Sequence, residues 1–115
     1  DWSANSGYEA GRYLAEHDRT MTAIYAANDQ MANGVIAALR DSGLRVPEDV
    51  SVVGVDDSLG DIVPDRRLTT VRFDNRRVGM WAVDKIAGAE GGASGVEHML
   101  IPGVLVEGDT VRDLR

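Results

Sequence analysis

The chain has 115 residues, no cysteine and a formal net charge of -7 at neutral pH. This length suffices for one domain with one core, and 43% hydrophobic and 27% charged residues are typical of a soluble globular domain. The acidic balance argues against binding of this piece to nucleic acid or to an anionic membrane. The absence of cysteine excludes disulfides and thiolate metal sites. No apolar run approaches the roughly 18 residues of a transmembrane span.

Residues 3–17 are predicted to form a helix. Ser3 is a suitable N-cap, and apolar and small residues recur at helical spacing. Gly7 and Gly11 are four residues apart on that face, which predicts a smooth stripe that lets the helix lie close on a sheet. The alternative is a helix that frays or starts late.

A strand, a helix and a second strand follow between residues 21 and 55. Residues 21–27 are short and apolar, which predicts a buried strand. The helix is expected to begin at once, with Asp29 as its cap and Gly43 just after its end. Residues 50–55 are rich in valine without alternation, as in a strand buried on both faces. The pattern is a βαβ unit with parallel strands.

The remaining residues complete an expected α/β fold, a three-layer parallel sheet with flanking helices. Residues 56–67 are predicted to be an irregular loop with one helical turn near 58–62, and 68–73 a third strand. Residues 88–95 form a predicted loop, and 96–101 with 104–106 a strand pair or one bent strand, before a frayed end. Residues 75–89 are predicted to be helical, with five residues facing inward: Val78, Ala82, Val83, Ile86 and Ala87.

Asn28 and Asp56 each follow a predicted strand, where polar side chains would reach the carboxyl edge of the sheet. Ligands of open α/β folds bind at that edge, and an amide beside a carboxylate suits vicinal hydroxyls, as in a sugar. The alternative is that both residues only cap helices or form turns. Trp2 offers a stacking surface for a sugar or base ring, or else is a core residue at a helix start.

Other chemistries find little support in the residues. Asp56 and Asp57, with Asp61 and Asp65, could suggest a magnesium site, but a receiver-type phosphorylation site would also need an aspartate at another strand end and a lysine opposite, and neither can be placed. The two histidines have no candidate nucleophile partner, and no glycine-rich phosphate loop is present. We therefore expect no metal, no cofactor and no enzymatic activity.

Four stretches together resemble the lactose-repressor family of bacterial transcription regulators: residues 1–7, 26–32, 42–57 and 68–71. The resemblance covers nearly the whole chain. It implies that residues 1–115 are the C-terminal portion of an effector domain, one lobe of a periplasmic-binding-protein-like type I fold. A DNA-binding domain and most of the other lobe would lie outside this chain.

The resemblance also implies roles for individual residues. Asn33 stands where an interface leucine is usual, Arg66 and Arg67 where two prolines are common, and Phe73 where the lactose-repressor pattern has a glutamine. By this resemblance, ligand-binding residues are Trp2, Asn28, Gln30, Asp56 and Phe73, and dimer-interface residues are Ser3, Asn33, Gly60, Pro64, Asp65 and Arg66.

The implied function is ligand sensing in a cytoplasmic repressor that binds a small sugar-like effector and acts as a homodimer. It would reach DNA only through its N-terminal domain and would not contact a membrane. One alternative is a periplasmic sugar-binding receptor of a transporter, which residues 44–57 disfavour. A second alternative is a fragment of an α/β enzyme, but this chain offers no placed nucleophile or phosphate loop for one.

Overall fold

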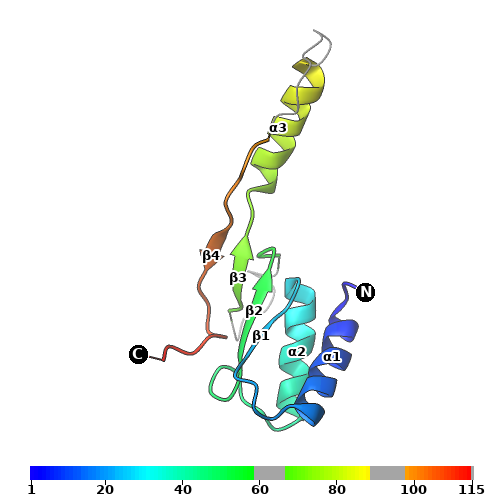
Figure 1. The fold of residues 1–115 in the computed structure, drawn as a ribbon, viewed down its shortest axis with the longest axis vertical. Coiled ribbons are helices and arrows are strands. Elements are labelled where there is room, and N and C mark those ends of the chain that lie inside the picture. Colours follow the sequence, from blue (N-terminus) through cyan, green and yellow to red (C-terminus); the bar gives the residue numbers. More distant parts are fainter. Residues whose placement is uncertain (59–66, 89–97, 115) are drawn as a thin grey trace. The chain divides into compact units, whose positions relative to one another are not determined.

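The structure, a computed structural model, describes residues 1–58, 67–88 and 98–114 (Figure 1). The chain divides into two compact units, Asp1–Arg72 with Leu105–Arg115, and Phe73–Val104. Within the described residues, no helix is long and apolar enough to cross a bilayer. The elements in chain order are α1 (Ala4–His17), β1 (Ala23–Tyr25), α2 (Asp29–Asp41), β2 (Ser51–Val55), β3 (Thr69–Arg72), α3 (Asn75–Gly88) and β4 (Val104–Val106).

The strands form one sheet in the order β1-β2-β3-β4. β1 pairs with β2 and β2 with β3, both in parallel, which confirms the predicted α/β fold. β1 lies at the edge of the sheet, and Tyr25 on it is 70% exposed, so the prediction of a buried strand is wrong there. In β2, Val52 is fully buried but Val53 only partly, so burial on both faces holds for only part of that strand.

The core lies between α2 and the sheet. Leu39 of α2 is fully buried and belongs to the same apolar cluster as Val50 and Val52. Gly43 follows the helix with a positive φ of 77°, and the N–H of Leu44 donates to the carbonyl of Leu39. This is the helix ending that the sequence predicts, because glycine adopts the left-handed conformation without a steric penalty.

The glycines of α1 face α2 rather than a sheet, so the predicted partner of this stripe is wrong. A Cβ at Gly7 would collide with the backbone of Met31, and a Cβ at Gly34 of α2 with the backbone of Ala4 and Tyr8. The missing side chains therefore let the two helix backbones lie in contact (Figure 1). The spacing identified the smooth face correctly, but spacing alone does not tell which element covers it.

Residues 108–112, which follow β4, are held by hydrogen bonds, contrary to the predicted frayed end. Thr110 is fully buried, and its backbone carbonyl accepts from the N–H of Val52 at 2.8 Å. Its hydroxyl donates to the carbonyl of Val52 at 2.7 Å and accepts from the N–H of Thr69 at 2.9 Å. This threonine thus satisfies backbone groups of two strands, which local sequence patterns cannot reveal.

In the second unit, α3 confirms the predicted helix but not its inward face. None of its described residues is buried, and Val78, Val83 and Ile86 are exposed. Residues 98–101 are not in a strand, whereas 104–106 are. The predicted turn at 59–62, the loop at 89–95 and residues 96 and 97 lie outside the described residues.

Gly34→Ala should destabilise the protein by about 1–3 kcal/mol, the usual cost of inserting a methyl group where there is no room. The added Cβ would meet backbone, which cannot move aside as a flexible side chain can. Chemical denaturation measures the change. Gly79→Ala is the matched control, because a Cβ there meets nothing within 4 Å and alanine favours the helix. Equal stability of Gly34→Ala and wild type would contradict the close contact.

Candidate functional site

The polar residue that caps α2 is Asn28, not Asp29 as predicted. The Asn28 Oδ1 atom accepts from the N–H of Met31 at 2.8 Å, and its Nδ2 atom donates to the carbonyl of Trp2 at 3.0 Å. The residue is only 9% exposed. Its amide therefore joins the start of α2 to the segment before α1, and it keeps one N–H and one lone pair for other partners.

Asp29, the first residue of α2, is 1% exposed and was not identified as a site residue from the sequence. Its Oδ2 atom accepts from the N–H of Ser58 at 2.8 Å, and its Oδ1 atom from the hydroxyl of Thr70 at 2.6 Å. A Cβ at Gly54 would collide with this carboxylate. A buried carboxylate needs such hydrogen-bond donors. The one sign of this site in the sequence was Gly54, because a glycine in the middle of a strand often marks the close approach of another group.

Asp56 and Asp57 directly follow β2 and both have positive φ, 107° and 53°. The N–H of Asp56 donates to the carbonyl of Val71 at 2.9 Å, while its side chain is exposed. The carboxylate of Asp57 instead accepts from Arg72 at 3.0 Å. Of the two acidic side chains, the Asp56 carboxylate is thus the one left open to a ligand.

Trp2 is 70% exposed, so the alternative that it is a core residue is wrong. It precedes Ser3, the N-cap of α1, whose Oγ accepts from the N–H of Ser6 as predicted. Its carbonyl is held by Asn28, and Gln30 is exposed in the first turn of α2. Two of the predicted ligand residues, Trp2 and Asn28, are therefore in direct hydrogen-bonded contact.

The other predicted site residues are less informative. Phe73 is exposed and belongs to the second unit, so it is described separately from the other ligand residues. Of the predicted interface residues, the structure describes Ser3 and Asn33, both half-buried. The remaining four lie outside the described residues: Gly60, Pro64, Asp65 and Arg66.

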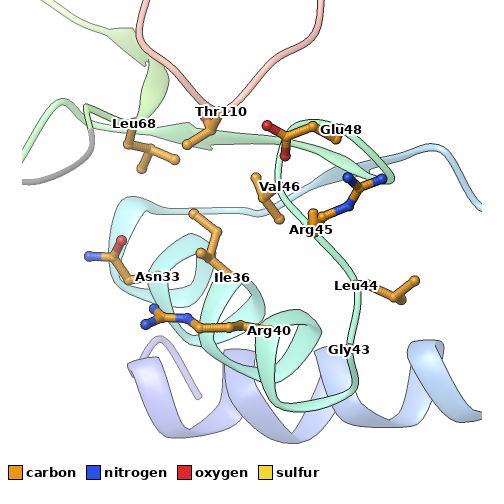
Figure 2. A pocket seen from close by; sticks show the side chains of 10 residues that line it. All are labelled: Asn33, Ile36, Arg40, Gly43, Leu44, Arg45, Val46, Glu48, Leu68 and Thr110. Atoms are coloured by element: carbon orange, nitrogen blue, oxygen red, sulfur yellow. The ribbon is translucent and has the colours of Figure 1, made fainter.

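A pocket of about 860 Å³ lies elsewhere, between α2 and the segment that follows it (Figure 2). None of the predicted ligand residues lines this pocket, but the predicted interface residue Asn33 does. Arg45 on its wall is committed to Asp49, with Nε and Nη2 donating to the two carboxylate oxygens at 2.9 and 2.8 Å. These hydrogen bonds hold the pKa of Asp49 well below its usual range.

The arrangement supports binding rather than bond-making chemistry. A carboxylate, a partly used amide and an exposed indole offer hydrogen bonds and an apolar face, which together suit a polyhydroxy ring. Among residues 1–58, 67–88 and 98–114, no three acidic or histidine side chains gather as a metal site requires.

A parallel sheet with polar side chains after its strands is the architecture of open α/β domains, whose ligands bind at the carboxyl edge. Residues 1–111 match the family described as "Periplasmic binding protein-like domain", and the chain belongs to that family. The lactose operon repressor of Escherichia coli (strain K12) is 38% identical over 110 residues, which are 96% of this chain and 31% of that protein. The transcriptional regulator MalR of Streptomyces coelicolor is 44% identical over 94 residues, 80% of this chain and 27% of that protein.

Solved structures agree with the sequence relatives. The lac repressor dimer bound to operator and the anti-inducer ONPF aligns with a TM-score of 0.86 and 38% identity, covering 96% of this chain and 39% of that one. A LacI-family regulator from Arthrobacter sp. FB24 in complex with lactose aligns at 0.77 and 36%, covering 96% and 42%. The predicted resemblance to the lactose-repressor family is confirmed, and the chain spans less than a third of the two curated relatives' length.

Asn28→Ala should lower the free energy of unfolding by about 1 kcal/mol, because the start of α2 loses its cap. Asn28→Ser is the matched variant: its hydroxyl oxygen can still accept from the N–H of Met31 as a helix cap, but the amide N–H that donates to the carbonyl of Trp2 is gone. Thermal unfolding should therefore find Asn28→Ser close to wild type and Asn28→Ala clearly lower. The same loss in both variants would mean that the Trp2 contact, not the cap, is what stabilises the protein.

Proposed function

We propose that this chain is the ligand-sensing part of a bacterial transcriptional regulator, a repressor, and that its effector is a small sugar. The observation that carries the proposal is at the strand ends: the amide of Asn28 holds the backbone carbonyl of Trp2, whose indole is exposed, and the carboxylate of Asp56 after β2 is exposed. Its relatives support the assignment: they are named as transcriptional repressors and regulators, and one relative's structure holds lactose.

Within this site we assign a distinct role to each residue. Trp2 stacks on the apolar face of a sugar ring, and Asp56 accepts hydrogen bonds from vicinal hydroxyls. Asn28 contributes its remaining N–H and lone pair, which restricts it to a secondary contact. Gln30 is a further proposed contact in the same unit, Phe73 of the second unit is proposed as a ligand residue from the resemblance alone, and the facing side of the cleft is proposed to come from residues outside this chain.

The proposed mechanism is a shift in population between two arrangements of the whole protein. A sugar that binds one arrangement better favours it by its difference in affinity, and a dimer passes this change to DNA-binding domains. Those domains lie outside this chain, in keeping with its net charge of -7. In this mechanism no bond is made or broken, so we propose that the protein is not an enzyme and that, as a regulator acting on operator DNA, it works in the cytoplasm.

A periplasmic sugar receptor of a transporter is the alternative, since it would use the same kind of fold and cleft. We do not favour it, because the named relatives cited above are regulators of transcription rather than transport proteins. The sequence upstream of Asp1 decides between the two: a helix-turn-helix supports the regulator, a signal peptide the receptor.

Sugar binding is tested by calorimetry on the full-length protein with lactose, galactose, glucose and ribose. We expect one of these sugars to bind, and Trp2→Ala or Asp56→Asn to weaken it by about tenfold or more, equal to about 1.4 kcal/mol. Tyr13→Ala is the control, an exposed aromatic residue near the other end of α1. Wild-type affinity in both site variants would contradict the assignment.

We also propose that the face of α2 bearing Asn33 contacts a second copy of the protein. The pocket in Figure 2 supports this, because it is open, partly apolar and bordered by Asn33 and by Arg40, whose guanidinium has no partner among the described residues. Ile36, Leu44 and Leu68 also line it. A relative's structure is a dimer, which supports the proposal that two copies associate.

Asn33→Arg should weaken such a dimer by about tenfold or more, because a second guanidinium beside Arg40 must lose its water on association. Light scattering coupled to size-exclusion chromatography, over a dilution series of the full-length protein, measures the dissociation. Arg19→Glu is the control, since Arg19 is exposed in the connection before β1. Unchanged dimerisation of Asn33→Arg would place the interface on another face.

A further inference from the structure

The backbone that carries the Asp56 carboxylate is in an unfavourable conformation. Asp56 and Asp57 have φ values of 107° and 53°, and two successive residues other than glycine rarely adopt positive φ. Such conformations persist only where surrounding contacts hold them. The direction in which Asp56 presents its carboxylate therefore depends on whatever fixes the next residues of the loop.

Two buried side chains make those contacts. The carboxylate of Asp29 accepts from the N–H of Ser58 at 2.8 Å and from the hydroxyl of Thr70 at 2.6 Å. The same hydroxyl accepts, at 3.4 Å, from the N–H of Asp57. Asp29 and Thr70 are each 1% exposed, so neither is available to a ligand in the cleft.

A glycine in β2 makes room for the Asp29 carboxylate, although glycine has a low propensity for strands. Gly54 weakens a central strand, yet any side chain there would collide with the Asp29 carboxylate. Asp29 follows Asn28, whose amide holds the carbonyl of Trp2. The first residues of α2 thus hold two parts of the site. Asn28 binds the carbonyl of Trp2, and Asp29 binds the backbone that follows Asp56.

We propose that Asp29 and Thr70 are positioning residues for the effector: they hold the backbone of 57–58 so that Asp56 faces the ligand, without touching the ligand themselves. This inference rests on the proposed function. It adds Asp29 and Thr70 as residues that determine the affinity for the effector without contacting it. A purely structural role would change stability alone, whereas a positioning role changes affinity through Asp56.

The first experiment needs no ligand. Hydrogen exchange, measured by mass spectrometry on full-length protein, should find the amide of Ser58 protected in wild type. Thr70→Val removes the hydroxyl that orients the Asp29 carboxylate, and should speed exchange in fragments containing Ser58 by about fivefold or more. Thr70→Ser keeps the hydroxyl and should resemble wild type. Equal exchange in Thr70→Val and Thr70→Ser would overturn the proposal.

The second experiment measures lactose affinity by calorimetry, with galactose as the second probe. Thr70→Val should weaken binding by about fivefold or more and Thr70→Ser by much less. In an Asp56→Asn background, which tolerates the positive φ, the effect of Thr70→Val should largely disappear, because residues that act through one group are not additive.

The outcomes separate the two hypotheses. Suppose that the sugars bind. The positioning role is then wrong if Thr70→Val retains wild-type affinity, or if it weakens binding by the same factor with and without Asp56→Asn. The proposed function stands in either case. If wild type binds neither sugar, the proposed function fails for these ligands, and the exchange of Ser58 still decides whether Asp29 and Thr70 hold the loop. Thr70→Ala, which also removes the hydroxyl, replaces Thr70→Val if that variant does not fold.

Discussion

The structure depends on a carboxylate buried at the first residue of α2. Burial of a polar group is costly unless it is hydrogen-bonded, and both oxygens of the Asp29 side chain have a donor, the backbone N–H of Ser58 and the hydroxyl of Thr70. Because these donors come from the loop after β2 and from β3, their distance from α2 is fixed within narrow limits. Position 54 of β2 can then be only glycine, because any side chain there would collide with the Asp29 carboxylate.

The elements themselves were largely predictable, since they depend on local chemistry. α2 is the best example: its apolar face, its Gly43 ending and the strands on either side all follow from patterns within about 35 residues of sequence. The cap was assigned one residue too late, because Asn28 and Asp29 are both good caps. Only the three-dimensional structure shows that Asp29 is needed elsewhere.

The parts that could not be predicted involve contacts between distant segments. The stripe of Gly7 and Gly11 was recognised, but its partner is a helix and not a sheet. The site was predictable as a set of strand-end residues, Asn28 and Asp56, and their assignment as ligand contacts stays a prediction. The exposed apolar residues of α3 were expected to face inward, but the described residues supply no surface that covers them.

Thr110 has a consequence for the order in which the protein can fold during synthesis. Its hydroxyl bonds to Val52 and Thr69 join residues 58 and 41 positions apart. A growing chain is made from its N-terminus at about 5–20 residues per second, so β2 and β3 are synthesised seconds before residue 110. Until then the N–H and carbonyl of Val52 lack their native partner, and the sheet cannot reach its final hydrogen bonding. Completion of this unit must therefore wait for translation of the whole second unit, during which its strands remain open to wrong pairing.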